Sequence, residues 1–212
     1  MNSQTERLTL TGMVGAVEAL RDHPSLEVGQ SPRGVAVIAH PHPLFGGTMH
    51  NKVVQTLARA FVQCGWVAVR FNFRGVGASA GAHDNGLGEA LDMQAVIDQV
   101  VPAGTPLALG GFSFGAFVAS HALESQWLHR PVEKVVLVGT ATTRFAVAAI
   151  PPEAHERTLV IHGEVDETVP LSSVMAWARP QVLPVTVVPG CEHFFHGQLP
   201  LLKGLVVRHL HA

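Results

Sequence analysis

The stretch LALGGFSFGAFVAS, residues 107–120, joins an apolar run to a small-residue segment through Gly-Phe-Ser-Phe-Gly. This pattern predicts a buried strand that turns directly into a helix at Ser113. A residue at such a turn is forced into sparsely populated backbone angles, and Gly111 and Gly115 leave room where the strand and helix approach. The serine hydroxyl would stand above the sheet beside a helix N-terminus, as a nucleophile requires.

A phosphate-binding loop and a plain structural turn are the alternatives for this stretch. A P-loop would need a lysine after the glycines, and none follows Gly115. The dinucleotide pattern G-x-G-x-x-G is also missing from this junction. The strand before and the helix after Ser113 therefore favour the nucleophile.

Short apolar runs alternate with helical patterns on both sides of this stretch. Most runs are apolar at nearly every position, which is typical of parallel strands covered on both faces. The alternation predicts an α/β fold: a doubly wound, mostly parallel sheet with helices on both faces and an antiparallel hairpin at one edge. The predicted strands are 34–41, 66–73, 106–113, 134–140, 158–163 and 184–190; the helices are 49–64, 86–100, 115–126, 172–179 and 197–210; the hairpin is 6–12 with 15–22.

Composition predicts a single globular domain over residues 1–212, with 47% hydrophobic and 14% charged residues. The net charge of −2 and the lack of basic runs argue against nucleic acid as a partner. No signal peptide and no run of about 20 apolar residues is found, so we expect no membrane insertion. Two cysteines indicate a reducing compartment, and we expect a cytoplasmic protein. The low charged fraction suggests an apolar surface patch and a homodimer.

A serine needs a base to take its proton and an acid to orient that base. TLVIHGEVDETVP (158–170) places Asp166 after one predicted strand, and VTVVPGCEHFFHG (185–197) places His193 after the next. The chain order Ser, Asp, His is one that hydrolases with this kind of strand–helix turn use. The competitors in the two loops are Glu164, Glu167 and His196, and His162 is expected to be structural.

A metal site is the other use for so many imidazoles. His-Pro-His (40–42) and His-Phe-Phe-His (193–196) match no compact metal-ligand pattern. We therefore expect neither a metal nor any other cofactor.

Acyl transfer also needs two backbone N–H groups aimed at the developing oxyanion. The first is expected from Phe114, directly after the serine. The second should come from the loop after strand 34–41, where Pro41 and Pro43 have no N–H. His42 is the preferred donor and Leu44 the reserve. The aromatic residues expected to contact substrate are Phe45, Phe194 and Trp177, with Phe112 and Phe195 assigned to the core.

Together these segments resemble the α/β-hydrolase superfamily over almost the whole chain. GFSFG resembles its nucleophile elbow, HGEVDETVP its acid loop and GCEHFF its histidine loop. FNFRGVGASAG (71–81) looks like another loop of the family, with Asn72 where Asp is common. HPHPLFGGTMHNKVVQTLARAF (40–61) is similar to small bacterial serine hydrolases related to dienelactone hydrolase.

The resemblance implies a compact serine esterase acting through an acyl-enzyme. Only about 17 residues separate Thr140 from Thr158, where this family inserts its lids, so no lid domain is expected. Dienelactone hydrolases use cysteine where this chain has Ser113, which argues against dienelactone as the substrate. Small acyl esters are expected instead. Thioesters and peptides or amides are alternatives that need the same groups, and a non-catalytic ligand-binding protein is a further one.

Overall fold

A computed structural model describes residues 5–212, which contain one eight-stranded sheet of order β1-β2-β4-β3-β5-β6-β7-β8. Strands β3 to β8 pair in parallel, whereas β1 pairs with β2 and β2 with β4 in antiparallel fashion. The strands are β1 (Thr5–Gly12), β2 (Gly15–Asp22), β3 (Val35–Ala39), β4 (Val67–Phe71), β5 (Leu107–Phe112), β6 (Val132–Val138), β7 (Thr158–Gly163) and β8 (Val185–Val188). The predicted mostly parallel sheet with an edge hairpin is confirmed.

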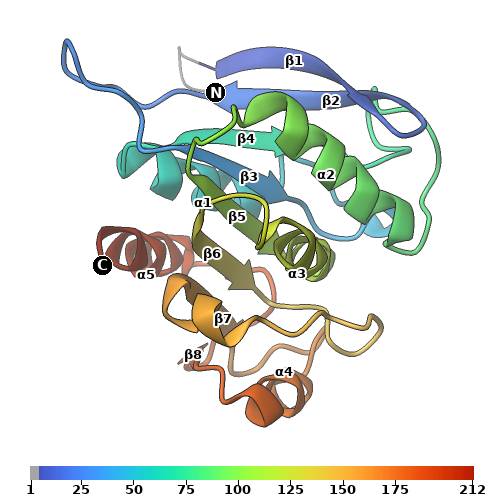
Figure 1. The fold of residues 1–212 in the computed structure, drawn as a ribbon. Coiled ribbons are helices and arrows are strands. Elements are labelled where there is room, and N and C mark those ends of the chain that lie inside the picture. The colour runs from blue at the N-terminus through green and yellow to red at the C-terminus, as the bar shows by residue number, and fades with distance from the viewer. Residues whose placement is uncertain (1–4) are drawn as a thin grey trace.

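Helices cover both faces of this sheet, α2 and α3 on one and α1 and α5 on the other (Figure 1). The helices are α1 (Lys52–Gln63), α2 (Leu87–Val100), α3 (Phe114–Gln126), α4 (Leu171–Ala178) and α5 (Leu199–His211), with short 3₁₀ turns η1 (Pro43–Phe45), η2 (Pro152–Arg157) and η3 (Arg179–Gln181). Two separate hydrophobic clusters result, one on each face of the sheet.

Strand β3 shows how the sequence produces these two clusters. All five of its residues are buried. Val35, Val37 and Ala39 face the cluster that includes α2 and α3, while Ala36 and Ile38 face the cluster that includes α1 and α5. A strand buried on both faces is apolar at most positions, which is why these runs do not alternate regularly with polar residues.

The predicted start of the helix at residue 49 differs from the structure because a side chain caps the helix further along the chain. Helix α1 begins at Lys52 and not at Met49, because the Asn51 side chain accepts a hydrogen bond from the Val53 N–H at 2.9 Å and caps the helix. Met49 is buried, and its N–H donates to Asn72 Oδ1 at 2.9 Å. Asn72 thus ties the start of α1 to the end of β4.

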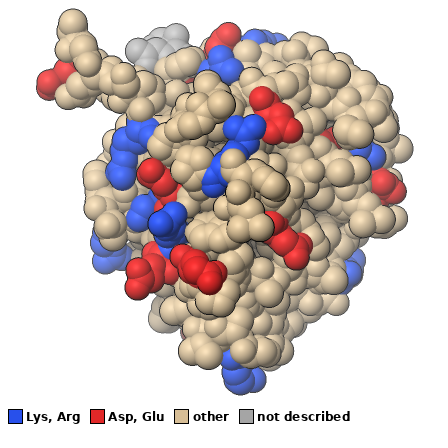
Figure 2. All heavy atoms as spheres, viewed as in Figure 1, with Lys and Arg blue, Asp and Glu red and all other residues tan. Residues whose placement is uncertain are grey.

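No lid domain separates β6 from β7, as expected. Residues 139–157 contain η2 as their only helix or strand. Within residues 5–212, no helix is long and apolar enough to cross a membrane. Acidic and basic side chains are interspersed on the face that Figure 2 shows.

Candidate active site

Ser113 lies between β5 and α3 in a strained conformation, with φ 56° and ψ −116°. Its N–H donates to the Val138 carbonyl at 2.8 Å, which ties the turn to the neighbouring strand β6. The two flanking glycines cannot carry side chains: an added Cβ on Gly111 would lie 2.2 Å from the Gly115 oxygen, and one on Gly115 would lie 2.3 Å from the Ala39 oxygen. Close backbone packing therefore holds the serine in an unfavourable backbone region.

Three side chains from distant loops meet at this turn. His193 Nε2 lies 3.0 Å from Ser113 Oγ, and His193 Nδ1 lies 2.6 Å from Asp166 Oδ2. The other carboxylate oxygen of Asp166 accepts the N–H groups of Thr168 at 2.9 Å and Val169 at 2.7 Å. With both carboxylate oxygens engaged, Asp166 has a fixed orientation. Ser113, Asp166 and His193 are all buried at more than 90%.

The competing residues in the same loops point elsewhere. His196 is exposed, and its Nδ1 lies 3.2 Å from Glu192 Oε1. Glu164 accepts the Gly190 N–H at 2.8 Å, and Glu167 is exposed. Of the candidate acids and bases, only Asp166 and His193 join Ser113 in a hydrogen-bonded chain within residues 5–212.

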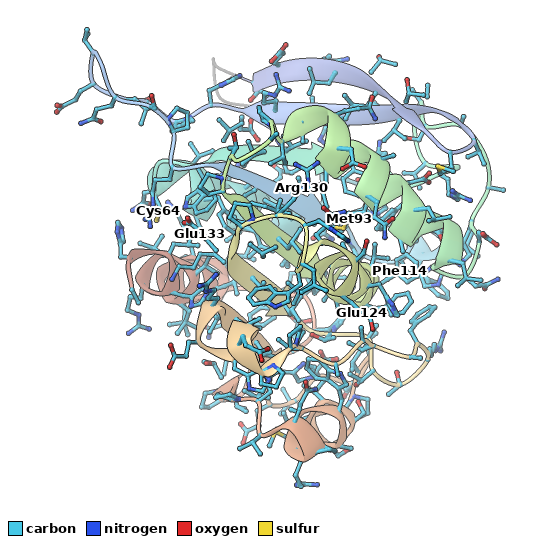
Figure 3. All side chains as sticks on the ribbon, viewed as in Figure 1. Cys64, Met93, Phe114, Glu124, Arg130 and Glu133 are labelled. Carbon is cyan, nitrogen blue, oxygen red and sulfur yellow. The ribbon has the colours of Figure 1, made fainter. Side chains whose placement is uncertain are left out.

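The expected oxyanion donors lie at the start of α3 and at the turn η1 after β3. Phe114 is the first residue of α3 (Figure 3), so its N–H has no acceptor within the helix. The N–H of Leu44, the alternative donor, already donates a hydrogen bond to His42 Nδ1 at 3.2 Å. In contrast, the His42 N–H donates no hydrogen bond to any group in residues 5–212, which leaves it available.

A cavity of about 520 Å³ opens over Ser113 and His193. Of the three aromatic residues proposed from the sequence, Phe45 and Phe194 line this cavity and Trp177 does not. Trp177 packs against the hydrophobic core and donates its indole N–H to the Ala148 carbonyl at 3.3 Å, which corrects the expectation for this residue. The other lining residues are Pro41, His42, Gly46, Gly47, Asn51, Phe114, Ala141, Thr143, Arg144, Phe145, Glu167, Thr168 and Val169.

Arg144 and Phe145 also line the cavity, and neither was predicted from the sequence. They follow β6, and ligands of such sheets bind at the carboxyl ends of the parallel strands. That rule was the available signal, but residues 139–157 carry no motif of their own. A second cavity of about 440 Å³, lined by Arg59, Arg70 and Lys203 among others, shares no residue with the first.

His40 is an imidazole outside the Ser113 site that holds backbone groups in place. His40 is fully buried, donates Nδ1–H to the Pro41 carbonyl at 2.6 Å and accepts the Phe73 N–H on Nε2 at 3.0 Å. Burial lowers the pKa of His40 to about 4. No group of three or more His, Cys, Asp or Glu side chains within residues 5–212 is arranged to hold a metal ion.

Comparison with known proteins agrees with this architecture. The model of the family described as serine aminopeptidase, S33, matches residues 30–154. A lidless α/β serine hydrolase from Xanthomonas campestris is 34% identical, with a TM-score of 0.86 over 100% of this chain and 95% of that one. The chain belongs to the α/β serine hydrolases.

Two further relatives of this α/β serine hydrolase extend the comparison. An α/β serine hydrolase homologue from Coxiella burnetii is 37% identical and has a TM-score of 0.80, with 97% of each chain covered. An uncharacterized protein of Rickettsia prowazekii (strain Madrid E) is 46% identical over 88 residues. That match covers 40% of this chain and 37% of the length of the Rickettsia protein.

Proposed function

We propose that this protein is a serine esterase that hydrolyses small carboxylic esters through a covalent acyl-enzyme. The observation that carries the proposal is the chain of two short contacts, 3.0 Å from Ser113 Oγ to His193 Nε2 and 2.6 Å from His193 Nδ1 to Asp166 Oδ2. A serine is a weak nucleophile unless a base takes its proton, and these contacts supply that base and its orienting acid.

In the first step, Ser113 Oγ attacks the ester carbonyl carbon and transfers its proton to His193 Nε2. Asp166 accepts a hydrogen bond from Nδ1–H, which fixes the tautomer and stabilises the imidazolium. The Phe114 and His42 N–H groups bind the carbonyl oxygen as it becomes negative. A single donor of this kind is typically worth about 10²- to 10³-fold in kcat.

The tetrahedral intermediate then collapses, and the departing alkoxide takes the proton from His193. Water attacks the acyl-enzyme with His193 again as the base, which releases the carboxylic acid and restores Ser113. Apart from the substrate and this water molecule, the proposed mechanism uses only groups of the protein. The open, lidless cavity, with Phe45 and Phe194 at its wall, suits small soluble acyl groups.

Hydrolysis of peptides or amides is the second candidate, because the family description names a serine aminopeptidase. Thioesters need the same groups. These substrate classes differ in the leaving group and not in the acylated residue, so a panel of matched acyl esters, thioesters and aminoacyl amides separates them by kcat/KM.

Fluorophosphonate labelling together with p-nitrophenyl acetate turnover tests the proposal. The wild-type protein should label and turn over, and Ser113→Ala should lose both. If the wild type neither labels nor turns over any substrate of the panel, the protein is a non-catalytic member of the fold. If Ser113→Ala retains activity, another residue is the nucleophile.

A further inference from the structure

Arg144 is a charged residue of the cavity that the proposed mechanism does not use. It lines the cavity with Ser113 and is exposed to solvent. Within residues 5–212 its guanidinium forms no ion pair and no hydrogen bond. The other cavity-lining cationic candidates are imidazoles. Arg144 is therefore the permanent positive charge of this cavity, and the described chain does not neutralise it.

The guanidinium is placed against an aromatic wall. Its Cζ lies 5.9 Å from the centroid of the Phe45 ring, within the range of a cation–π interaction. The His42 ring meets the same Phe45 ring edge-on at 4.8 Å. Phe45, His42 and Arg144 thus gather at one side of the cavity. Phe145, the neighbour of Arg144, also reaches this side, with its ring 5.8 Å from that of His42.

His42 adds a neutral hydrogen-bond donor to this side of the cavity. Its Nδ1 accepts the Leu44 N–H at 3.2 Å, so the proton of the neutral ring lies on Nε2. Burial, together with the nearby His83 and Arg144, lowers the pKa of His42. Nε2–H has no acceptor within residues 5–212.

The carboxylates that face these groups are few. Glu167 lines the cavity but is exposed and lies beyond ion-pair distance of Arg144. Glu89, which faces His83 at 2.8 Å between Nδ1 and Oε1, is fully buried and does not line the cavity. One side of the cavity therefore presents a planar cation, a neutral N–H donor and aromatic rings, and no acceptor from residues 5–212 is bound to the cation or to the N–H donor.

We propose that Arg144 binds a carboxylate carried by the substrate, so that the preferred esters of this site are anionic ones. The proposal rests on the proposed function, since it names the substrate class of the same site. Guanidinium matches a carboxylate with two parallel N–H donors, and the Phe45 ring lies within cation–π range of the Arg144 guanidinium. His42 Nε2–H supplies a further donor to the same anion.

The carboxylate can lie in the acyl part or in the alcohol part of the ester, and two substrate pairs distinguish these sources. Monomethyl adipate is compared with the corresponding terminal carboxamide for the acyl side, and 4-acetoxybenzoate with 4-acetoxybenzamide for the alcohol side. In each pair a carboxylate is replaced by a neutral group of the same shape. At pH 7.5, we expect the carboxylate member of at least one pair to have the higher kcat/KM by about tenfold or more.

Variants assign this preference to Arg144. Arg144→Gln should lower the carboxylate-to-carboxamide ratio of kcat/KM about tenfold, and Arg144→Lys should give an intermediate ratio because it keeps the charge but loses the planar fork. Glu167→Gln should raise this ratio, because it removes a negative charge that repels the substrate carboxylate. Arg179→Gln is the matched control, because Arg179 is also an exposed arginine but does not line the cavity. Its ratio should equal that of the wild type.

A wild-type enzyme that hydrolyses p-nitrophenyl acetate but shows a ratio near one in both pairs overturns this proposal and leaves the esterase proposal intact. An unchanged ratio in Arg144→Gln also overturns it. If no ester is turned over, the proposed function fails, and a binding measurement then tests the role of Arg144 by itself. In calorimetry, Ser113→Ala should bind adipate or 4-hydroxybenzoate, and the double variant Ser113→Ala/Arg144→Gln should bind the same anion about tenfold more weakly. Equal affinities of these two proteins would overturn the assignment to Arg144.

Discussion

His162 Nε2–H donates a hydrogen bond of 2.8 Å to the carbonyl oxygen of Val169, across the loop that carries Asp166. The N–H of Val169 in turn donates to Asp166 Oδ1 at 2.7 Å. His162 Nε2 also lies 3.5 Å from Asp166 Oδ2, and the imidazole is fully buried. Burial lowers the pKa of His162, so the ring is a neutral donor that closes the acid loop over the end of β7.

Replacing His162 by phenylalanine should lower kcat about 10- to 100-fold, because a small displacement of Asp166 misorients His193. His162→Gln keeps an N–H near the position of Nε2 and should retain most of the activity. Steady-state kinetics on p-nitrophenyl acetate measure both. Equal kcat values for the phenylalanine and glutamine variants would show that the hydrogen bond to Val169 does not position the acid.

Asp166→Asn should lower kcat about 10⁴-fold with little change in folding. The N–H groups of Thr168 and Val169 require an oxygen at Oδ1, so the asparagine must turn its NH₂ group toward His193. His193 Nδ1 must then accept a hydrogen bond, which moves the proton to Nε2 and leaves no base for Ser113. The measurement is kcat together with circular dichroism, and a variant of near wild-type activity would contradict the assigned role of Asp166.

Two glycine-to-alanine substitutions should change stability in opposite directions. Gly115→Ala places a Cβ 2.3 Å from the Ala39 oxygen and should lower the free energy of unfolding by about 3 kcal/mol. Gly204→Ala, in the exposed face of α5, meets nothing within 4 Å and should raise it by up to about 1 kcal/mol. Urea unfolding of both variants checks this, and equal effects would show that the packing of α3 on β3 is looser than described.

Stability should fall as the pH decreases from about 6.5 to about 4 because of His40. Folding lowers its pKa from 6.5 to about 4, so in this interval the unfolded chain binds a proton that the folded chain does not. The stability contributed by the neutral ring is therefore present above pH 6.5 and is lost progressively below it, by about 3 kcal/mol in total.

Urea unfolding at several pH values, compared between the wild type and His40→Gln, isolates this contribution. Glutamine retains an amide that can bond to Pro41 and Phe73 but does not titrate. The wild type should lose more stability than the variant between pH 7 and pH 4. Parallel pH dependences would show that His40 does not titrate as its burial requires.

The sequence by itself determined the sheet and the turn at Ser113. Residues 107–120 carry the strand, the tight turn and the helix in one continuous stretch, so local sterics suffice to predict them. The all-apolar runs such as Val35–Ala39 predicted parallel strands covered on both faces, because burial on two faces leaves few positions for a polar residue. The chain order also indicated Asp166 and His193 as partners of the serine.

The tertiary structure alone decided which groups meet and which are free. The Leu44 N–H is occupied by the ring of His42, Trp177 packs away from the cavity, and Arg144 lies against Phe45. None of these relationships follows from periodicity, because each depends on how an irregular loop closes over a strand end. Strand and helix patterns arise from contacts a few residues apart, whereas a 3.0 Å approach between residues 113 and 193 requires the whole sheet to be assembled.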